Sequence, residues 1–158
     1  MSLTAVSAPS PEIAQHLAAQ QCAVQWRGFL QALTDEFASS LSPEDLHALM
    51  FRVGTRFAAA NLLAPSATLD ELQRSMTAVW ERIDWGWVQL SQETARLNIQ
   101  HSLSPVSAAF GVNHVQWSGG FLEGVYQSWL EQAGSGSLRV VQVAPADAWG
   151  CVQFQLAR

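Results

Sequence analysis

The spacing of apolar residues changes near the middle of the chain. Before residue 83, apolar positions recur every three or four residues, which is the period of an amphipathic helix. From Trp85 the spacing shortens to two, because Trp85 and Trp87 flank Gly86 and are followed by Val88 and Leu90. Two-residue alternation is typical of a strand with one buried face. The chain is therefore expected to pass from a helical half into a half that contains strands.

Helix-start signals divide the first half into three predicted helices, over about residues 11–38, 43–60 and 68–83. Ser10-Pro11-Glu12 and Ser42-Pro43-Glu44 each place a capping hydroxyl before a proline and an acid. Thr68 and Glu71 have the spacing of a capping box. Residues 1–10 are small and polar, and they are expected to form a flexible arm before a single domain of residues 11–158.

Two glycine patterns add detail to these helices. Gly28 is expected to bend the first helix. Gly54 lies inside the second predicted helix, and Gly120 and Gly124 lie one turn apart in a later one. Glycine in a helix interior is unfavourable by about 1 kcal/mol relative to alanine, so a close approach between two helices is expected at these positions.

The second half predicts a strand-strand-helix-strand-strand unit with a small antiparallel sheet, and the fold class is therefore α+β. Trp117–Gln132 is apolar nearly all round, so this helix is expected to be buried centrally or between subunits. Gln92–Thr94 is the expected hairpin turn. The four predicted strands, the last of which includes Cys151, are Gly86–Ser91, Ala95–His101, Leu138–Val143 and Trp149–Leu156.

Composition limits the classes of partner. Hydrophobic residues make up 49% of the chain and charged residues only 13%, a combination that predicts surface covered by other subunits. The net charge is −5 and all eight basic residues are arginines without a basic run, which excludes nucleic acid and anionic membranes as partners. No segment resembles a signal peptide or a membrane span, and Cys22 and Cys151 are expected to be free thiols. We therefore expect a cytoplasmic protein.

No catalytic, metal or cofactor site is predicted. Adjacent acids occur at residues 35–36, 44–45 and 70–71, and the last two pairs lie in first helical turns, where acids stabilise the helix dipole. The four histidines lack metal-ligand spacing. Gln116 replaces the first glycine of a serine-hydrolase elbow before Trp117-Ser118-Gly119. The seven tryptophans raise the possibility of sugar stacking, but their positions on helical and strand stripes favour a structural role.

Four segments follow one another along the chain and carry a further signal: Phe29–Leu33, Val53–Phe57, Ile83–Leu90 and Leu122–Trp129. The third reads Ile-Asp-Trp-Gly-Trp-Val-Gln-Leu and the fourth Leu-Glu-Gly-Val-Tyr-Gln-Ser-Trp. They resemble the pattern of the bacterial cellulose synthase operon protein D family, an Ile-Asn/Asp-Trp-Gly-Tyr/Trp-Val-x-Leu block followed by Leu-Glu-Gly-x-Tyr-x-x-Trp. The resemblance covers about residues 26–157.

The resemblance implies a non-catalytic accessory subunit that forms a ring-like octamer, a tetramer of dimers, and helps order glucan chains or arrange synthase complexes. Its partners would be other copies of the chain, other synthase subunits and β-1,4-glucan. The resemblance also leaves a periplasmic location as the alternative to the expected cytoplasmic one. In the family, the N-terminal segment contacts glucan, which implies glucan contacts in the N-terminal arm of this chain, at Ser2, Leu3, Thr4, Ala5 and Val6. The structural or interface candidates are Trp85, Trp87, Glu123, Tyr126 and Trp129.

A second interpretation remains open. Three helices followed by a strand-strand-helix-strand-strand unit also resemble vinyl-reductase-type sensor domains, which hold a small apolar ligand in an internal pocket. The C-terminal cysteine-rich pattern of that family is missing, since only Cys151 stands there. This interpretation predicts a monomer or dimer with a large cavity, whereas the scaffold interpretation predicts a higher closed oligomer.

Overall fold

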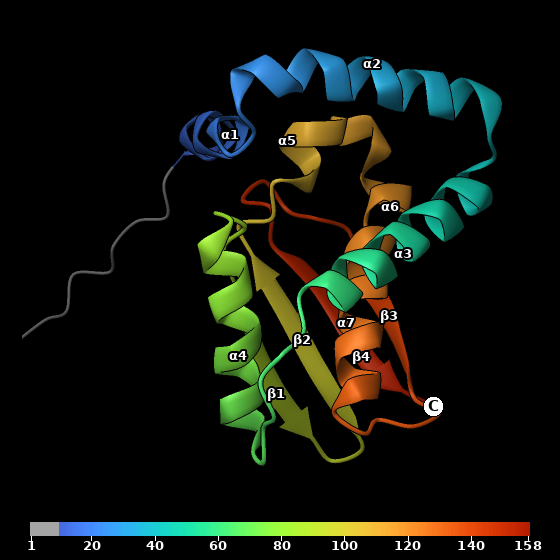
Figure 1. Cartoon of the computed structure of the whole chain (residues 1–158). Coiled ribbons are helices and arrows are strands. Elements are labelled where there is room, and N and C mark those ends of the chain that lie inside the picture. Colours follow the sequence, from blue (N-terminus) through green and yellow to red (C-terminus); the bar gives the residue numbers. More distant parts are fainter. Residues whose placement is uncertain (1–9) are drawn as a thin grey trace, which may run out of the picture.

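The structure, a computed structural model, describes residues 10–158, except for the side chains of residues 14, 15 and 18. It confirms the α+β class: helices precede a four-stranded antiparallel sheet (Figure 1). Residues 1–9 of the predicted arm lie outside the described residues. The helical half consists of α1 (Pro11–Gln20), α2 (Val24–Ser40), α3 (Pro43–Ala60) and α4 (Leu69–Arg82).

The first predicted helix is two helices, and the break lies at residues 21–23 rather than at Gly28. Ala23, which precedes α2, has non-helical backbone angles and no side-chain cap. The Arg27 guanidinium donates hydrogen bonds to the carbonyl oxygens of Ala19 and Cys22, at the end of α1 and in the connection. A side chain from the second helix therefore satisfies carbonyls that the break leaves free.

The other predicted helix starts are confirmed. The Asp45 backbone N–H donates to Ser42 Oγ at 3.1 Å, which caps α3. Thr68 and Glu71 form the predicted capping box at the start of α4. These local signals set the residues at which the two helices begin.

The second half confirms the predicted strand-strand-helix-strand-strand order. The strands are β1 (Trp87–Glu93), β2 (Arg96–Ser102), β3 (Arg139–Ala144) and β4 (Val152–Ala157), and they lie in the order β1-β2-β4-β3. Between β2 and β3 the chain forms α5 (Val106–Phe110), a 3-10 turn η1 (Val112–His114), α6 (Val115–Ser118) and α7 (Gly120–Gln132). The predicted helix 117–132 is thus divided into α6 and α7.

Two strand boundaries differ from the sequence prediction. Gln92 and Glu93 belong to β1, and the turn is Thr94-Ala95. Trp149 and Cys151 precede β4, because Asp147 Oδ1 accepts hydrogen bonds from both backbone N–H groups, at 2.8 and 2.9 Å. This aspartate-centred turn replaces the predicted start of the last strand.

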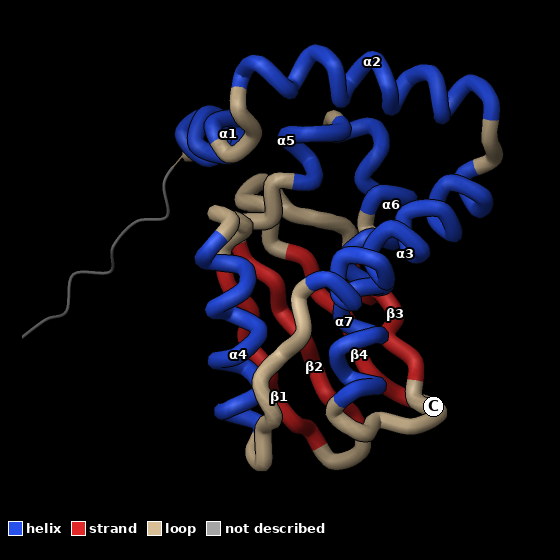
Figure 2. Tube along the Cα trace, in the orientation of Figure 1, coloured by secondary structure: helices blue, strands red, loops and turns tan. Residues whose placement is uncertain are grey.

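The helices α3, α4 and α7 lie on one side of the sheet, and α3 packs directly on α7 (Figure 2). A Cβ atom at Gly54 would overlap the Phe121 carbonyl oxygen, and one at Gly124 would overlap the Phe51 carbonyl oxygen. The two backbones therefore touch, which confirms the expected close contact. The helix α7 is buried on nearly all sides, also as predicted.

Candidate functional site

The centre of the core is an aromatic cluster around α7. Trp80, Tyr126 and Trp129 have no exposed area, and the Trp129 indole N–H donates to the Asn61 carbonyl oxygen at 2.9 Å. Trp85, at the switch between the helical and strand halves, stacks on Trp80 with a centroid distance of 5.8 Å. Aromatic side chains thus occupy the middle of the fold.

A buried polar chain runs through this cluster. His101 Nδ1 lies 2.6 Å from the Tyr126 hydroxyl, and His101 Nε2 lies 2.8 Å from the Trp85 carbonyl oxygen. Burial lowers the pKa of His101 to about 4 and raises that of Tyr126 well above its ordinary value, so both are neutral at pH 7. The imidazole Nε2–H therefore donates to Trp85, and the tyrosine O–H donates to Nδ1. With both side chains at 0% exposure, this arrangement holds β2, α7 and Trp85 together.

Glu123 joins three elements beneath the surface. One carboxylate oxygen accepts the Gln142 backbone N–H at 2.6 Å, and the other lies 2.8 Å from His47 Nε2. Glu123 is 6% exposed, whereas the His47 side chain borders a small hollow of about 290 Å³ beside Trp117. Because both carboxylate oxygens are occupied by contacts to β3 and α3, we assign Glu123 a structural role.

The helix α7 covers the free edge of β3 with side chains spaced four residues apart. The backbone N–H of Val140 donates to Gln127 Oε1 at 2.8 Å, and Gln127 Nε2 donates to the Leu138 carbonyl oxygen at 3.0 Å. Glu123 accepts from Gln142 one turn earlier. These side chains take the hydrogen bonds that an added strand would take.

The opposite edge is covered in the same way by α4. The backbone N–H of Val88 donates to Thr77 Oγ1, and the Thr77 hydroxyl donates back to the Val88 carbonyl oxygen, at 3.3 and 3.2 Å. One turn away, the Leu90 N–H donates to Gln73 Oε1 at 2.7 Å. Both outer strands are therefore paired with a helix, and strand addition to either of these segments is blocked.

Sequence reasoning missed both edge covers. The signal was present as polar residues four apart on otherwise apolar helix faces, at residues 73 and 77 and at residues 123 and 127. Polar residues at such positions are ordinarily predicted to face solvent. Only the position of each helix beside an edge strand gives them a backbone partner.

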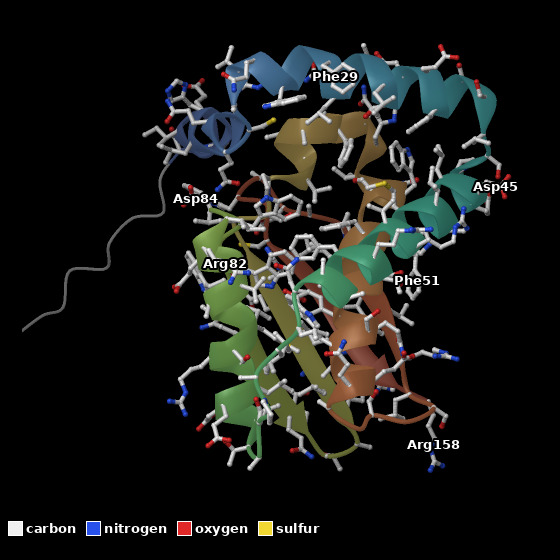
Figure 3. The ribbon with its side chains drawn as sticks, in the orientation of Figure 1. Phe29, Asp45, Phe51, Arg82, Asp84 and Arg158 are labelled. Carbon is white, nitrogen blue, oxygen red and sulfur yellow. The ribbon has the colours of Figure 1, made fainter. Side chains whose placement is uncertain are left out.

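The helices α1 and α2 form an outer layer, which lies apart from the sheet in Figure 1. Of the 17 residues of α2, only Thr34 is buried. Trp26 and Phe29 are 56% and 58% exposed and meet edge to face with ring centroids 6.1 Å apart; Phe29 is labelled on α2 in Figure 3. Further exposed apolar side chains on the layer are Ile13, Leu17 and Val24.

A cleft of about 820 Å³ lies between this outer layer and the α5–η1 segment. Asp35 of α2 reaches across it to His114, with Oδ1 and Nε2 at 3.3 Å. The Asp35 side chain is 76% exposed, so the link is solvated and weak. The outer layer is thus attached to the body over a limited area.

The remaining predicted residues fall in different places. Trp87 is 41% exposed and shares the outward face of β1 with Gln89. Ser2, Leu3, Thr4, Ala5 and Val6 lie outside the described residues. Within residues 10–158, no group of three or more histidines, cysteines and acids gathers as metal ligands would, and Cys22 and Cys151 are free. No helix in this part of the chain combines the length and apolar character that a membrane crossing requires.

Comparison with known proteins identifies the family. The model that describes the D-subunit family of cellulose synthase matches residues 12–156, and the chain belongs to this family. Membership gives it an accessory role in cellulose biosynthesis.

Two further comparisons add no functional assignment. A comparison with curated proteins found no match. Among solved structures, a vinyl-4-reductase family protein from Methanocaldococcus jannaschii is similar at 13% identity and a TM-score of 0.46, over 98% of each chain. At this identity and TM-score, the likeness assigns no function.

Proposed function

We propose that this chain is a non-catalytic scaffold subunit of cellulose biosynthesis that self-associates through the outer layer formed by α1 and α2. The observation that carries the proposal is the exposed apolar surface of that layer, which includes the Trp26–Phe29 ring pair. Apolar clusters of this kind on soluble proteins mark interaction surfaces.

The partner in this proposal is a second copy of the chain. A self-complementary helical face pairs naturally about a twofold axis, and such dimers assemble further into closed rings. The alternative of joining subunits by sheet extension is opposed by α4 and α7, which cover β1 and β3. The proposed assembly is the octamer, a tetramer of dimers, that the family resemblance implies.

Within this scaffold, the octamer orders glucan chains or arranges synthase subunits so that crystalline cellulose forms. The N-terminal residues Ser2–Val6 remain the proposed glucan contacts. Trp85, Glu123, Tyr126 and Trp129 serve as structural residues. The free cysteines are compatible with the proposed cytoplasmic location. Aromatic side chains occupy the core where the sensor interpretation requires a ligand cavity, and this favours the scaffold.

Solution mass by light scattering across a dilution series tests the proposal. The wild-type chain should give an octamer that is stable to dilution, and the double variant Trp26→Asp, Phe29→Asp should give a smaller species with unchanged circular dichroism. Leu62→Asp is the matched control, because Leu62 is 71% exposed and lies outside the layer. A wild-type monomer, or an octamer unaffected by the double variant, would contradict the proposal.

A further inference from the structure

The sheet face that points away from α3, α4 and α7 carries rows of uncharged amide side chains. Because side chains alternate along a strand, the buried residues Val88, Ile99 and Phe154 leave their neighbours on the outward face. The cross-strand register aligns Gln89, Gln100 and Gln153 in one row. The next row contains Ser91, Asn98 and Gln155.

These rows form an open hollow of about 540 Å³. Within residues 10–158, the five amides of the two rows make no side-chain hydrogen bond. Gln73, which also borders the hollow, and Gln127 and Gln142 instead use their amides to bind backbone groups. Asparagine is also unfavourable in a central strand. The chain therefore places free hydrogen-bonding groups on a surface where β-branched residues would form a better strand.

We propose that this amide face binds a neutral polyhydroxylated polymer, namely a β-glucan chain. Each amide both donates and accepts hydrogen bonds, as each sugar hydroxyl does. Trp87 lies one row beyond Gln89 on the same face, and its indole offers an exposed apolar ring for the C–H face of a sugar. The inference rests on the proposed function, because a role in cellulose biosynthesis supplies the polymer.

Other occupants fit the face less well. The two rows hold no charged side chain, and the next row on this face pairs Glu93 with Arg96, so the hollow offers no concentration of one charge to nucleic acid or to a charged peptide. An extended peptide ordinarily binds by pairing with a strand edge, and helices cover both outer strands. A second copy of the chain is the remaining competitor, since amide ladders can stack on one another.

The test is co-sedimentation of the full chain with microcrystalline cellulose, together with light scattering on the same samples. Gln100→Ala combined with Gln153→Ala removes the central row, and we expect about tenfold weaker binding with unchanged mass, since each lost hydrogen bond contributes modestly. Gln132→Ala is the matched control, because that amide is exposed at the end of α7. Trp87→Ala should also weaken binding, and Trp87→Phe should restore much of it.

Four other outcomes overturn the inference, and a fifth overturns the scaffold proposal alone. Equal binding of the wild type and the row variant would place the glucan site elsewhere, and loss of binding only on deletion of residues 2–9 would assign it to the N-terminal segment. A row variant of smaller mass would make the face a subunit interface. If an intact octamer fails to bind cellulose, the inference fails and the scaffold proposal stands. If no octamer forms and the row variant still weakens cellulose binding, the scaffold proposal fails and the amide-face inference stands.

Discussion

The Thr77 side chain pairs with the Val88 backbone in both directions, accepting its N–H and donating to its carbonyl oxygen. A single hydroxyl thus takes both hydrogen bonds that the residue would exchange with a neighbouring strand. Gln127 covers the edge of β3 with an amide that binds two residues: it accepts from the Val140 N–H and donates to the Leu138 carbonyl oxygen, just before the strand. The sheet is closed at both sides by helices, and growth of an assembly must use other surfaces.

Replacing Thr77 by valine tests this edge cover. The variant keeps the shape of the side chain but leaves two backbone groups of Val88 without a partner, and it should lower the free energy of unfolding by about 1–3 kcal/mol. Urea denaturation measures the change. Thr55→Val is the control, because the exposed Thr55 hydroxyl donates only to the Phe51 carbonyl oxygen, one turn earlier in α3. Equal stabilities of the two variants would show that Thr77 acts only as a packing group.

Removing the cover from β3 should also promote association through the sheet edge. Gln127→Met preserves the length of the side chain and removes its hydrogen bonds to Leu138 and Val140. We expect concentration-dependent aggregation with increased strand signal, because an uncovered edge recruits other strands. Infrared spectroscopy and light scattering after mild heating would detect it. A variant that aggregates no faster than Gln132→Met would show that the edge is protected by other means.

The fold was largely predictable because its signals are local. The caps at Ser42 and Thr68, and the alternation through Val88 and Leu90, each lie within a few residues of sequence and can be read without knowing any tertiary contact. Where the prediction was wrong, distant or competing contacts decide the structure. Arg27 stabilises a helix break that contains neither glycine nor proline, and Asp147 ends an alternation that would otherwise include Trp149.

The candidate site was less predictable for a related reason. Trp87 continues the strand alternation, yet the pattern alone does not say which face of a four-stranded sheet the helices cover. The role of Gln100 depends on its register with Gln89 and Gln153, which lie in different strands. Register across three strands is a tertiary property, so the amide rows emerge only in the folded chain.

Two glycine-to-alanine changes should alter stability in opposite directions. Gly54→Ala forces a methyl group into the Phe121 carbonyl oxygen, and we expect a loss of about 1–3 kcal/mol. Gly28 lies inside α2 with no neighbouring atom within 4 Å of an added Cβ, so Gly28→Ala should gain about 0.5–1 kcal/mol. Thermal unfolding of both variants checks the pair. A neutral Gly54→Ala would show that α3 and α7 can separate without penalty.

The buried His101 should make the fold less stable as the pH falls from 7. Its pKa is about 4 in the folded chain and about 6.5 when unfolded, so between these values the unfolded state binds the proton more readily. Stability is therefore full above pH 6.5 and decreases toward pH 4, by on the order of 2 kcal/mol between pH 7 and pH 5. Urea denaturation at a series of pH values measures this slope.

The variant His101→Gln separates this contribution from other titrating groups. It should be less stable than the wild type at pH 7, because the hydrogen bonds to Tyr126 and Trp85 are altered, but its stability should vary less between pH 7 and pH 5. His16→Gln, which changes an exposed imidazole on α1 and leaves the buried one in place, is the matched control. If His101→Gln kept the wild-type slope, the His101 imidazole would be protonated within the core, and the hydrogen-bond directions assigned to Tyr126 and Trp85 would have to be revised.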